Sequence, residues 1–130
     1  MEGRLVIPQF NVDARISFLV DTGADSSLIA PADAKEMGID IAQLGTPVGS
    51  LGVGGTALSH RVRGSLVFME RRFVYVYHLD ALDIAAPDPQ MEEMPSLLGR
   101  EILDRWRMIY DPSRGNLSFI VRSADLVLDV

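Results

Sequence analysis

The fold of this chain is decided by the stretch Phe18-Leu-Val-Asp-Thr-Gly-Ala-Asp-Ser-Ser-Leu-Ile29, which joins an apolar strand to a turn of small residues. Asp21 comes directly after the apolar run and before Thr22 and Gly23, so the strand delivers a carboxylate at its own end. Asp, Thr and Gly are also common in ordinary strand-ending turns, because short polar side chains hydrogen-bond the nearby backbone. The tripeptide therefore indicates either an acid–base site or a plain turn.

Two further segments bear on that choice. The segment Gly49-Ser-Leu-Gly-Val-Gly-Gly55 precedes a long predicted strand and is typical of a mobile hairpin tip. It is a weak phosphate cradle, because no strand–loop–helix context surrounds it and no Lys-Ser/Thr pair follows. The segment Ser96-Leu-Leu-Gly-Arg-Glu-Ile-Leu103 places two apolar residues before a glycine and then begins a short helix.

In this order the three segments resemble the retropepsin family, the retroviral-type aspartic proteases, over about residues 5–121. The form Asp-Thr-Gly-Ala, rather than Asp-Thr-Gly-Ser, and the downstream Leu97-Leu-Gly-Arg100 are both similar to that family's elements. The resemblance implies that Asp21 is the catalytic carboxylate, that Thr22 ties the two active-site loops together and that Gly23 shapes the loop.

The resemblance also implies an all-β fold with one or two short helices, a closed β-barrel that is active as a symmetric homodimer. Asp25 and Arg100 match the positions of a structural ion pair beside the site. The remaining implied site residues are those that bind substrate, Ala24, Asp25 and the flap residues Gly52, Val53, Gly54 and Gly55, and those that support the loop, Leu98, Gly99 and Arg100.

Peptide hydrolysis without a metal or a covalent intermediate needs one group to take a proton from water and another to give one to the carbonyl oxygen. Two carboxylates about 3 Å apart do both, because they share one proton. This chain supplies one Asp-Thr-Gly, so the mechanism demands a second copy with its own Asp21. We expect no cofactor and no metal, and an extended peptide as substrate, bound as an added strand beneath the flap with Val53 as an apolar lid.

Outside these segments the pattern predicts a mostly β domain. The sequence predicts one hairpin from strands 5–10 and 15–20, a helix over 31–37, long strands over 57–69 and 72–78, an acidic surface connection over 79–95, a short helix over 100–105, and a second hairpin from 106–110 and 116–121. We expect one domain over 1–130. The tail 123–130 either forms a dimer strand, which we favour, or is disordered or part of a larger protein.

Composition limits the other classes of function. At 130 residues with 48% hydrophobic content, the chain suits one domain. A net charge of −6 argues against nucleic-acid binding, and the absence of cysteine excludes thiol chemistry. The first twenty residues lack the apolar core of a signal peptide, and no apolar stretch suits a membrane-spanning helix, so we expect a soluble protein and favour the cytoplasm.

Two enzyme classes and one binding class compete with the protease interpretation. A serine hydrolase is disfavoured, since only His60 and His78 are available and no Gly-x-Ser-x-Gly occurs. Metal hydrolysis lacks His-Glu-x-x-His. The serious alternative is a non-catalytic peptide-binding or assembly module with a retropepsin-like fold, and the intact Asp-Thr-Gly argues against it.

Overall fold

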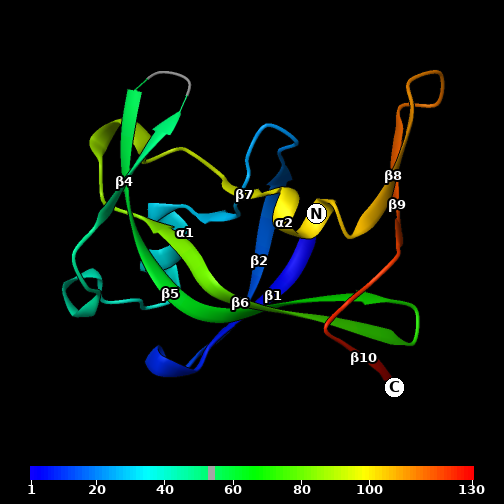
Figure 1. The fold of residues 1–130 in the computed structure, drawn as a ribbon, viewed down its shortest axis with the longest axis horizontal. Coiled ribbons are helices and arrows are strands. Elements are labelled where there is room, and N and C mark those ends of the chain that lie inside the picture. Colours follow the sequence, from blue (N-terminus) through cyan, green and yellow to red (C-terminus); the bar gives the residue numbers. More distant parts are fainter. Residues whose placement is uncertain (53–54) are drawn as a thin grey trace.

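The computed structural model describes residues 1–52 and 55–130, with side chains outside residues 50–57 (Figure 1). The described strands are β1 (Glu2–Ile7), β2 (Val12–Val20), β3 (Leu28–Ile29), β4 (Val48–Gly52), β5 (Gly55–Glu70), β6 (Phe73–Ala85), β7 (Ser96–Leu98), β8 (Trp106–Asp111), β9 (Asn116–Val121) and β10 (Leu126–Asp129). The described helices are α1 (Pro31–Glu36) and α2 (Arg100–Leu103), with 3-10 turns η1 (Pro8–Phe10), η2 (Ile41–Gln43) and η3 (Pro89–Met91). Over this part of the chain, neither helix has the length or the apolar character needed to cross a membrane.

The strands close into a barrel. The sheet order β6-β3-β7-β2-β1-β5 is completed by pairing of β5 with β6, and β4 and β10 are attached at its edges. Most neighbours are antiparallel, but β2 and β7 run parallel, as do β3 and β6. The predicted all-β fold with two short helices and a closed barrel is therefore confirmed.

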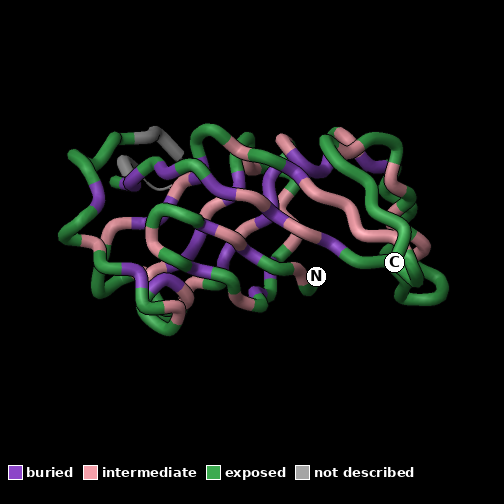
Figure 2. The backbone as a smooth tube through the Cα atoms, turned by 90° about the horizontal axis from the view of Figure 1, so that it is seen from below, coloured by how far each residue is buried: buried purple, intermediate pink, exposed green. Residues whose placement is uncertain are grey.

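The core fills the inside of this barrel, because alternate side chains of each strand point inward. Figure 2 shows the result: along the strands, buried residues are separated by intermediate and exposed ones. The fully or almost fully buried members that line the interior are Leu5, Ile7, Ile16, Phe18, Ile29, Leu66, Phe68, Tyr77, Leu82, Ile84, Leu98 and Ile102. Aliphatic side chains dominate this set, and burial of their surface is the main source of stability.

The predicted elements are recovered with shifted ends. The first predicted strand ends at Ile7, because Pro8 has no N–H to donate to the ladder and starts η1, which Asn11 caps with φ 55°. The larger correction concerns 79–95, which we expected to be a surface connection. Strand β6 continues to Ala85, where Leu82 and Ile84 alternate inward and are fully buried, so only residues 86–95 connect β6 to β7.

The tail 123–130 is an ordered part of the sheet. Strand β10 pairs antiparallel with β6, with Leu126 opposite Val76, and it lies on the lower side of the molecule in Figure 1. Asp125 fixes the start of this strand: it accepts the His78 backbone N–H at 2.7 Å and pairs with Arg105 at 2.8 Å. The His78 N–H, with the Arg105 guanidinium, lowers the pKa of Asp125. The disordered alternative for the tail is thus wrong.

Strands β8 and β9 form a separate two-stranded sheet that projects from the barrel (Figure 1). Its base is anchored by Trp106, whose indole N–H donates to the hydroxyl of Tyr77 at 2.7 Å. That hydroxyl donates in turn to the Ser123 carbonyl at 2.8 Å, and burial raises the pKa of Tyr77. One buried hydroxyl therefore joins β6, β8 and the start of the tail.

Replacement of Tyr77 by phenylalanine tests this anchor. We expect Tyr77→Phe to lower the free energy of unfolding by about 1–3 kcal/mol, because the Trp106 N–H loses its acceptor in a buried setting. Urea denaturation followed by Trp106 fluorescence measures the loss. A variant as stable as the wild type would show that the hydroxyl contributes nothing, and Tyr75→Phe, on the same strand, is the matched control.

Candidate active site

The loop 21–27 leaves the end of β2 at the upper side of the barrel in Figure 1. Because β2 runs parallel to β7 with Val20 opposite Leu98, the chain direction carries both strands to the same edge. The backbone N–H of Asp21 donates to the Leu98 carbonyl at 3.0 Å, one residue beyond the paired strands. The sheet pairing thus places Asp21 at a fixed position.

The loop itself orients the Asp21 carboxylate. The backbone N–H of Gly23 donates to Asp21 Oδ1 at 2.9 Å, and the N–H of Ala24 donates to the Asp21 carbonyl at 3.2 Å. A side chain that accepts a hydrogen bond from the residue two positions on is typical of an Asx turn. The side chain is half-buried, so the carboxylate is both held by its own loop and open to solvent.

The second part of the loop is bound to the start of α2. The N–H of Arg100 donates to the Ala24 carbonyl at 2.8 Å, and the N–H of Glu101 donates to the Asp25 carbonyl at 3.2 Å. These are N–H groups of the first helical turn, which have no partner inside a helix, so the loop satisfies them. The loop and α2 therefore complete each other's hydrogen bonding.

Gly99 allows the two segments to touch. A Cβ at this position would lie 2.5 Å from the carbonyl carbon of Ser26, closer than any side chain can approach backbone. The N–H of Gly99 donates to Ser27 Oγ at 2.9 Å, and Ser27 is fully buried. Glycine follows the apolar pair Leu97-Leu98 because the loop backbone occupies the space that a side chain would fill.

Glu101 is a member of the site that sequence reasoning missed. Its carboxylate accepts the backbone N–H of the buried Ser27, so a side chain of α2 holds the end of the Asp21 loop. Burial raises the pKa of Glu101, and the hydrogen bonds from Ser27 oppose that rise. In the sequence Glu101 is one of several acidic residues near a helix start, and only tertiary structure singles it out.

The expected ion pair between Asp25 and Arg100 is present beside the loop. Both side chains reach into solvent, with exposed fractions of 82% for Asp25 and 48% for Arg100. A pair of this exposure contributes at most about 1 kcal/mol to stability, because water screens the charges. In the single chain the pair therefore contributes little to stability.

The remaining expected site residues differ in how far they are buried. Leu98, an expected support of the loop, is fully buried, whereas Leu19, which pairs with Leu97 on the neighbouring strand, is 55% exposed. Thr22 is exposed, on the outer surface of the loop. Of these residues only Leu98 belongs to the apolar core.

The residues that we expected to form a flap are described in part. Strands β4 and β5 form the expected hairpin, and the described pair nearest its turn is Gly52 with Gly55. Val53 and Gly54, which we expected to close over substrate, lie outside the described residues. In Figure 1 this hairpin rises on the same side of the barrel as the Asp21 loop.

Neither histidine belongs to this site. His60 is buried with Nδ1 2.7 Å from the Gly45 carbonyl, and His78 Nδ1 lies 2.9 Å from Ser65 Oγ on the exposed side of β5 and β6. Across residues 1–52 and 55–130, no three His, Cys, Asp or Glu side chains gather closely enough to hold a metal ion. The ionisable side chain at the start of this loop is the Asp21 carboxylate.

Comparison with known proteins gives three findings. A family model described as aspartyl protease matches residues 7–102. Among solved structures, the chain is similar to a retropepsin-like aspartic protease from Rickettsia conorii, with a TM-score of 0.57 and 21% identity over 92% of this chain and 88% of that chain. It is also similar to EIAV protease complexed with the inhibitor HBY-793, with a TM-score of 0.49 and 22% identity over 80% of this chain and 85% of that chain. A search of curated proteins gave no match.

Substitution of Glu101 tests its part in the site. Its pKa in the folded protein lies above the ordinary 4.5, so folding favours the protonated form, and the free energy of unfolding falls as pH rises from 4.5 through the raised pKa. Glu101→Gln removes this titration but keeps an oxygen for the Ser27 N–H. We therefore expect the stability of Glu101→Gln relative to wild type to increase across that window, measured by urea denaturation at several pH values.

Glu101→Ala separates the hydrogen bond from the charge. It leaves the buried Ser27 N–H without an acceptor, and we expect a loss of about 1–3 kcal/mol even at acidic pH. Parallel pH profiles of wild type and Glu101→Gln would contradict the burial argument, and an undiminished Glu101→Ala would contradict the hydrogen bond.

Proposed function

This chain belongs to the aspartyl protease family, and from that premise we propose that it is an aspartic endopeptidase whose active site forms between two copies, each contributing Asp21. The observation that carries the proposal is the loop geometry: Asp21 is delivered by β2, held by Leu98 and oriented by Gly23. The chain contains a single Asp-Thr-Gly. A two-carboxylate mechanism therefore needs a second subunit, and a two-fold axis beside Asp21 supplies it.

In the proposed mechanism the two Asp21 carboxyl groups share one proton. The ionised carboxylate takes a proton from water as the water oxygen adds to the peptide carbonyl carbon, while the protonated carboxyl gives its proton to the carbonyl oxygen. The tetrahedral intermediate then breaks at the C–N bond as the nitrogen leaves protonated. All the atoms come from water, the peptide and the two carboxyl groups, so the reaction needs no cofactor.

We assign the other expected residues to the same reaction. Gly52 and Gly55, with Val53 and Gly54 between them, act as the flap whose backbone binds an extended peptide as an added strand. Ala24 and Asp25 line the substrate channel next to the carboxylates, and Thr22 joins the two Asp21 loops across the axis. The exposed position of Thr22 suits that contact. In this proposal residues 1–130 act as one domain.

The first test removes the proton-transfer group. Asp21→Asn keeps an oxygen that accepts the Gly23 N–H, so the loop retains its shape. The amide, unlike a carboxyl group, cannot act as a general acid or base in proton transfer. We expect cleavage of an unstructured polypeptide to fall by more than about 100-fold, with wild-type activity greatest in mildly acidic solution. Asp13→Asn, which removes an exposed carboxylate paired with Arg4, is the matched control and should stay active.

Equal activity of wild type and Asp21→Asn would overturn the catalytic proposal. Saturable peptide binding by both proteins with no cleavage at any pH would favour the non-catalytic peptide-binding module instead. A rate independent of pH up to the alkaline range would contradict a shared proton.

The second test concerns the number of subunits. If half of the site comes from each copy, specific activity falls on dilution as the dimer dissociates. A fusion of two copies through a flexible linker should lose far less activity over the same range, because its second subunit is always present. A single-copy rate that is strictly proportional to protein concentration would refute the two-subunit site.

A further inference from the structure

Strand β2 carries an exposed leucine close to Asp21. Leu19 is 55% exposed, although β2 lies inside the sheet between β1 and β7. Successive side chains of a strand point to opposite faces, so Leu19 shares a face with Ser17, while Phe18 belongs to the core. At about 3.3 Å per residue, Leu19 lies about 7 Å from Asp21 along the chain. A peptide held at Asp21 is therefore within side-chain reach of Leu19.

An open hollow of about 400 Å³ lies at Leu19. The described residues that line it are Ser17, Phe18, Leu19, Asp33, Met94 and Pro95. Four of these six side chains are apolar, and Asp33 is the one described lining residue with an ionisable side chain. The hollow thus combines apolar walls with one carboxylate.

A buried serine fixes the carboxylate of Asp33. The hydroxyl of Ser96, at the start of β7, donates to Asp33 Oδ2 at 2.5 Å and accepts the Ala30 backbone N–H at 2.9 Å. Ser96 is fully buried, so this contact holds the carboxylate against the barrel. Within the described part of the chain, nothing donates to Asp33 Oδ1 and no Arg or Lys pairs with Asp33. A fixed carboxylate with a free oxygen is a strong acceptor for a cationic donor.

The charges around the hollow also favour a cation. Lys35 follows Asp33 by two positions on α1, which places it about 200° around the helix, and its side chain is exposed. The connection 86–95, which contributes Met94 and Pro95 to the lining, contains three acidic residues and no basic one. A negatively charged surround of this kind attracts a positively charged ligand and repels an acidic one.

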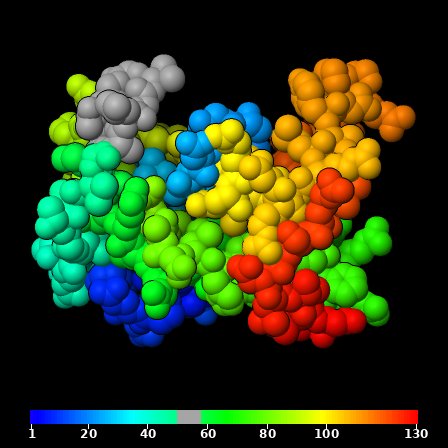
Figure 3. Space-filling model, in the orientation of Figure 1, coloured from blue at the N-terminus to red at the C-terminus, as the bar shows by residue number. Residues whose placement is uncertain are grey.

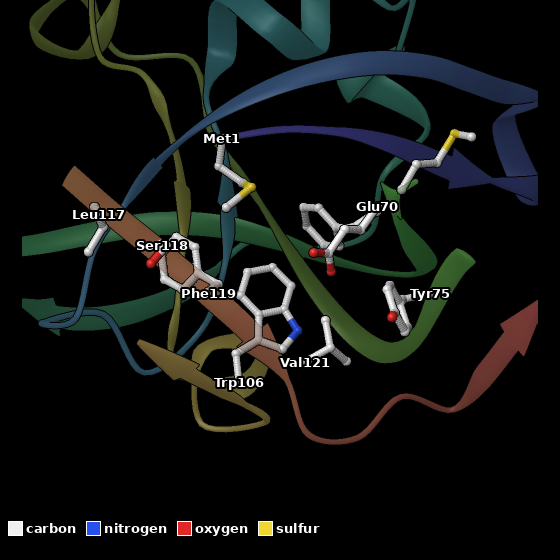
Figure 4. A pocket seen from close by; sticks show the side chains of 10 residues that line it. Met1, Glu70, Tyr75, Trp106, Leu117, Ser118, Phe119 and Val121 are labelled. Atoms are coloured by element: carbon white, nitrogen blue, oxygen red, sulfur yellow. The ribbon is translucent and has the colours of Figure 1, made fainter. Parts of the chain in front are cut away.

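The hollow at Leu19 is on the side of the molecule that carries the Asp21 loop. Figures 1 and 3 show this loop, in blue, and the connection 86–95, in yellow-green, both along the upper side. Another hollow, of about 260 Å³, lies between the β8–β9 hairpin and the barrel, and it too has a carboxylate, Glu70, in its lining (Figure 4). Among the described residues, neither β2 nor the loop 21–27 contributes to that second lining. Glu70 therefore offers a matched carboxylate away from Asp21.

We propose that the hollow at Leu19 binds a basic side chain, Lys or Arg, of an extended peptide substrate, and that Asp33 selects it by charge. This inference rests on the proposed function, since Asp21 acts on the bond that is cleaved. The aliphatic stem of the basic side chain packs on Leu19 and Met94, and its charged end reaches the Asp33 carboxylate. Because the hollow begins about 7 Å from Asp21, the basic residue lies within about two positions of the cleaved bond.

Two peptide pools test this preference. Both are random mixtures of uncharged residues except at one central position, which is lysine in one pool and norleucine in the other, so the pools differ in charge but share the aliphatic stem. Initial rates below KM give the ratio of kcat/KM, and mass spectrometry of the products locates the cleaved bond. We expect the wild type to favour the lysine pool at least about 10-fold, equivalent to about 1.4 kcal/mol, and to cut within about two positions of the lysine.

Three variants separate charge selection from a structural role of Asp33. Asp33→Asn keeps an oxygen for the Ser96 hydroxyl but removes the charge, and we expect its lysine-to-norleucine ratio to fall within about 2-fold of unity. Leu19→Lys, at an exposed position, supplies the chain's own cation to the hollow and should abolish the preference in the same way. Glu70→Gln, in the other hollow, should keep the wild-type ratio. A loss of rate that is equal for both pools in Asp33→Asn, with the ratio unchanged, would show a structural role and overturn the inference.

A binding measurement separates this inference from the proposed function. Fluorescence anisotropy with labelled pools and the Asp21→Asn protein reports binding without cleavage, and we expect the lysine pool to bind at least about 10-fold more tightly. Cleavage by the wild type without any lysine preference overturns the role of the hollow and leaves the protease standing. Tighter binding of the lysine pool that depends on Asp33, with no cleavage by the wild type, overturns the protease and supports the hollow. Neither cleavage nor a difference in binding overturns both.

Discussion

The site depends on one hydrogen-bonded joint between segments about 75 positions apart, the loop 21–27 and the residues 98–101. Backbone groups of Asp21, Ala24 and Asp25 bind partners in the second segment, and the Ser27 N–H binds the Glu101 carboxylate. Each of these hydrogen bonds provides a partner for a polar backbone group that would otherwise have none, either in the interior or at the start of a helix. The carboxylate of Asp21 is therefore positioned by the backbone on both sides of the joint, and side-chain charge contributes little.

This joint explains two features of the chain at once. It requires glycine at position 99, because the loop backbone occupies the space that a Cβ would need. It also depends on the parallel pairing of β2 with β7, since parallel strands end at the same edge of the sheet. The barrel is thus a rigid support for the Asp21 loop.

Much of the fold follows from local pattern. The two predicted hairpins, both short helices and the long strands are present, because period-2 alternation, Pro31 and the turn Asp111-Pro-Ser-Arg-Gly115 act within a few residues. The acidic segment after His78 was misassigned, since Asp80 is exposed on a strand in which Leu82 and Ile84 are fully buried. The high number of acidic residues in that segment favoured a surface loop, whereas the two-residue spacing of Leu82 and Ile84 indicates a strand.

The sequence by itself determined a mostly β fold in which Asp21 follows a strand and precedes Gly23, because these signals lie in residues that are neighbours along the chain. Only the tertiary structure decided that Glu101 holds the loop, that the Asp25–Arg100 pair is open to solvent, that the tail pairs with β6 and that Asp33 lines the hollow at Leu19. The physical reason is that exposure and hydrogen-bond partners depend on what the rest of the chain brings alongside, and a linear pattern does not contain that information.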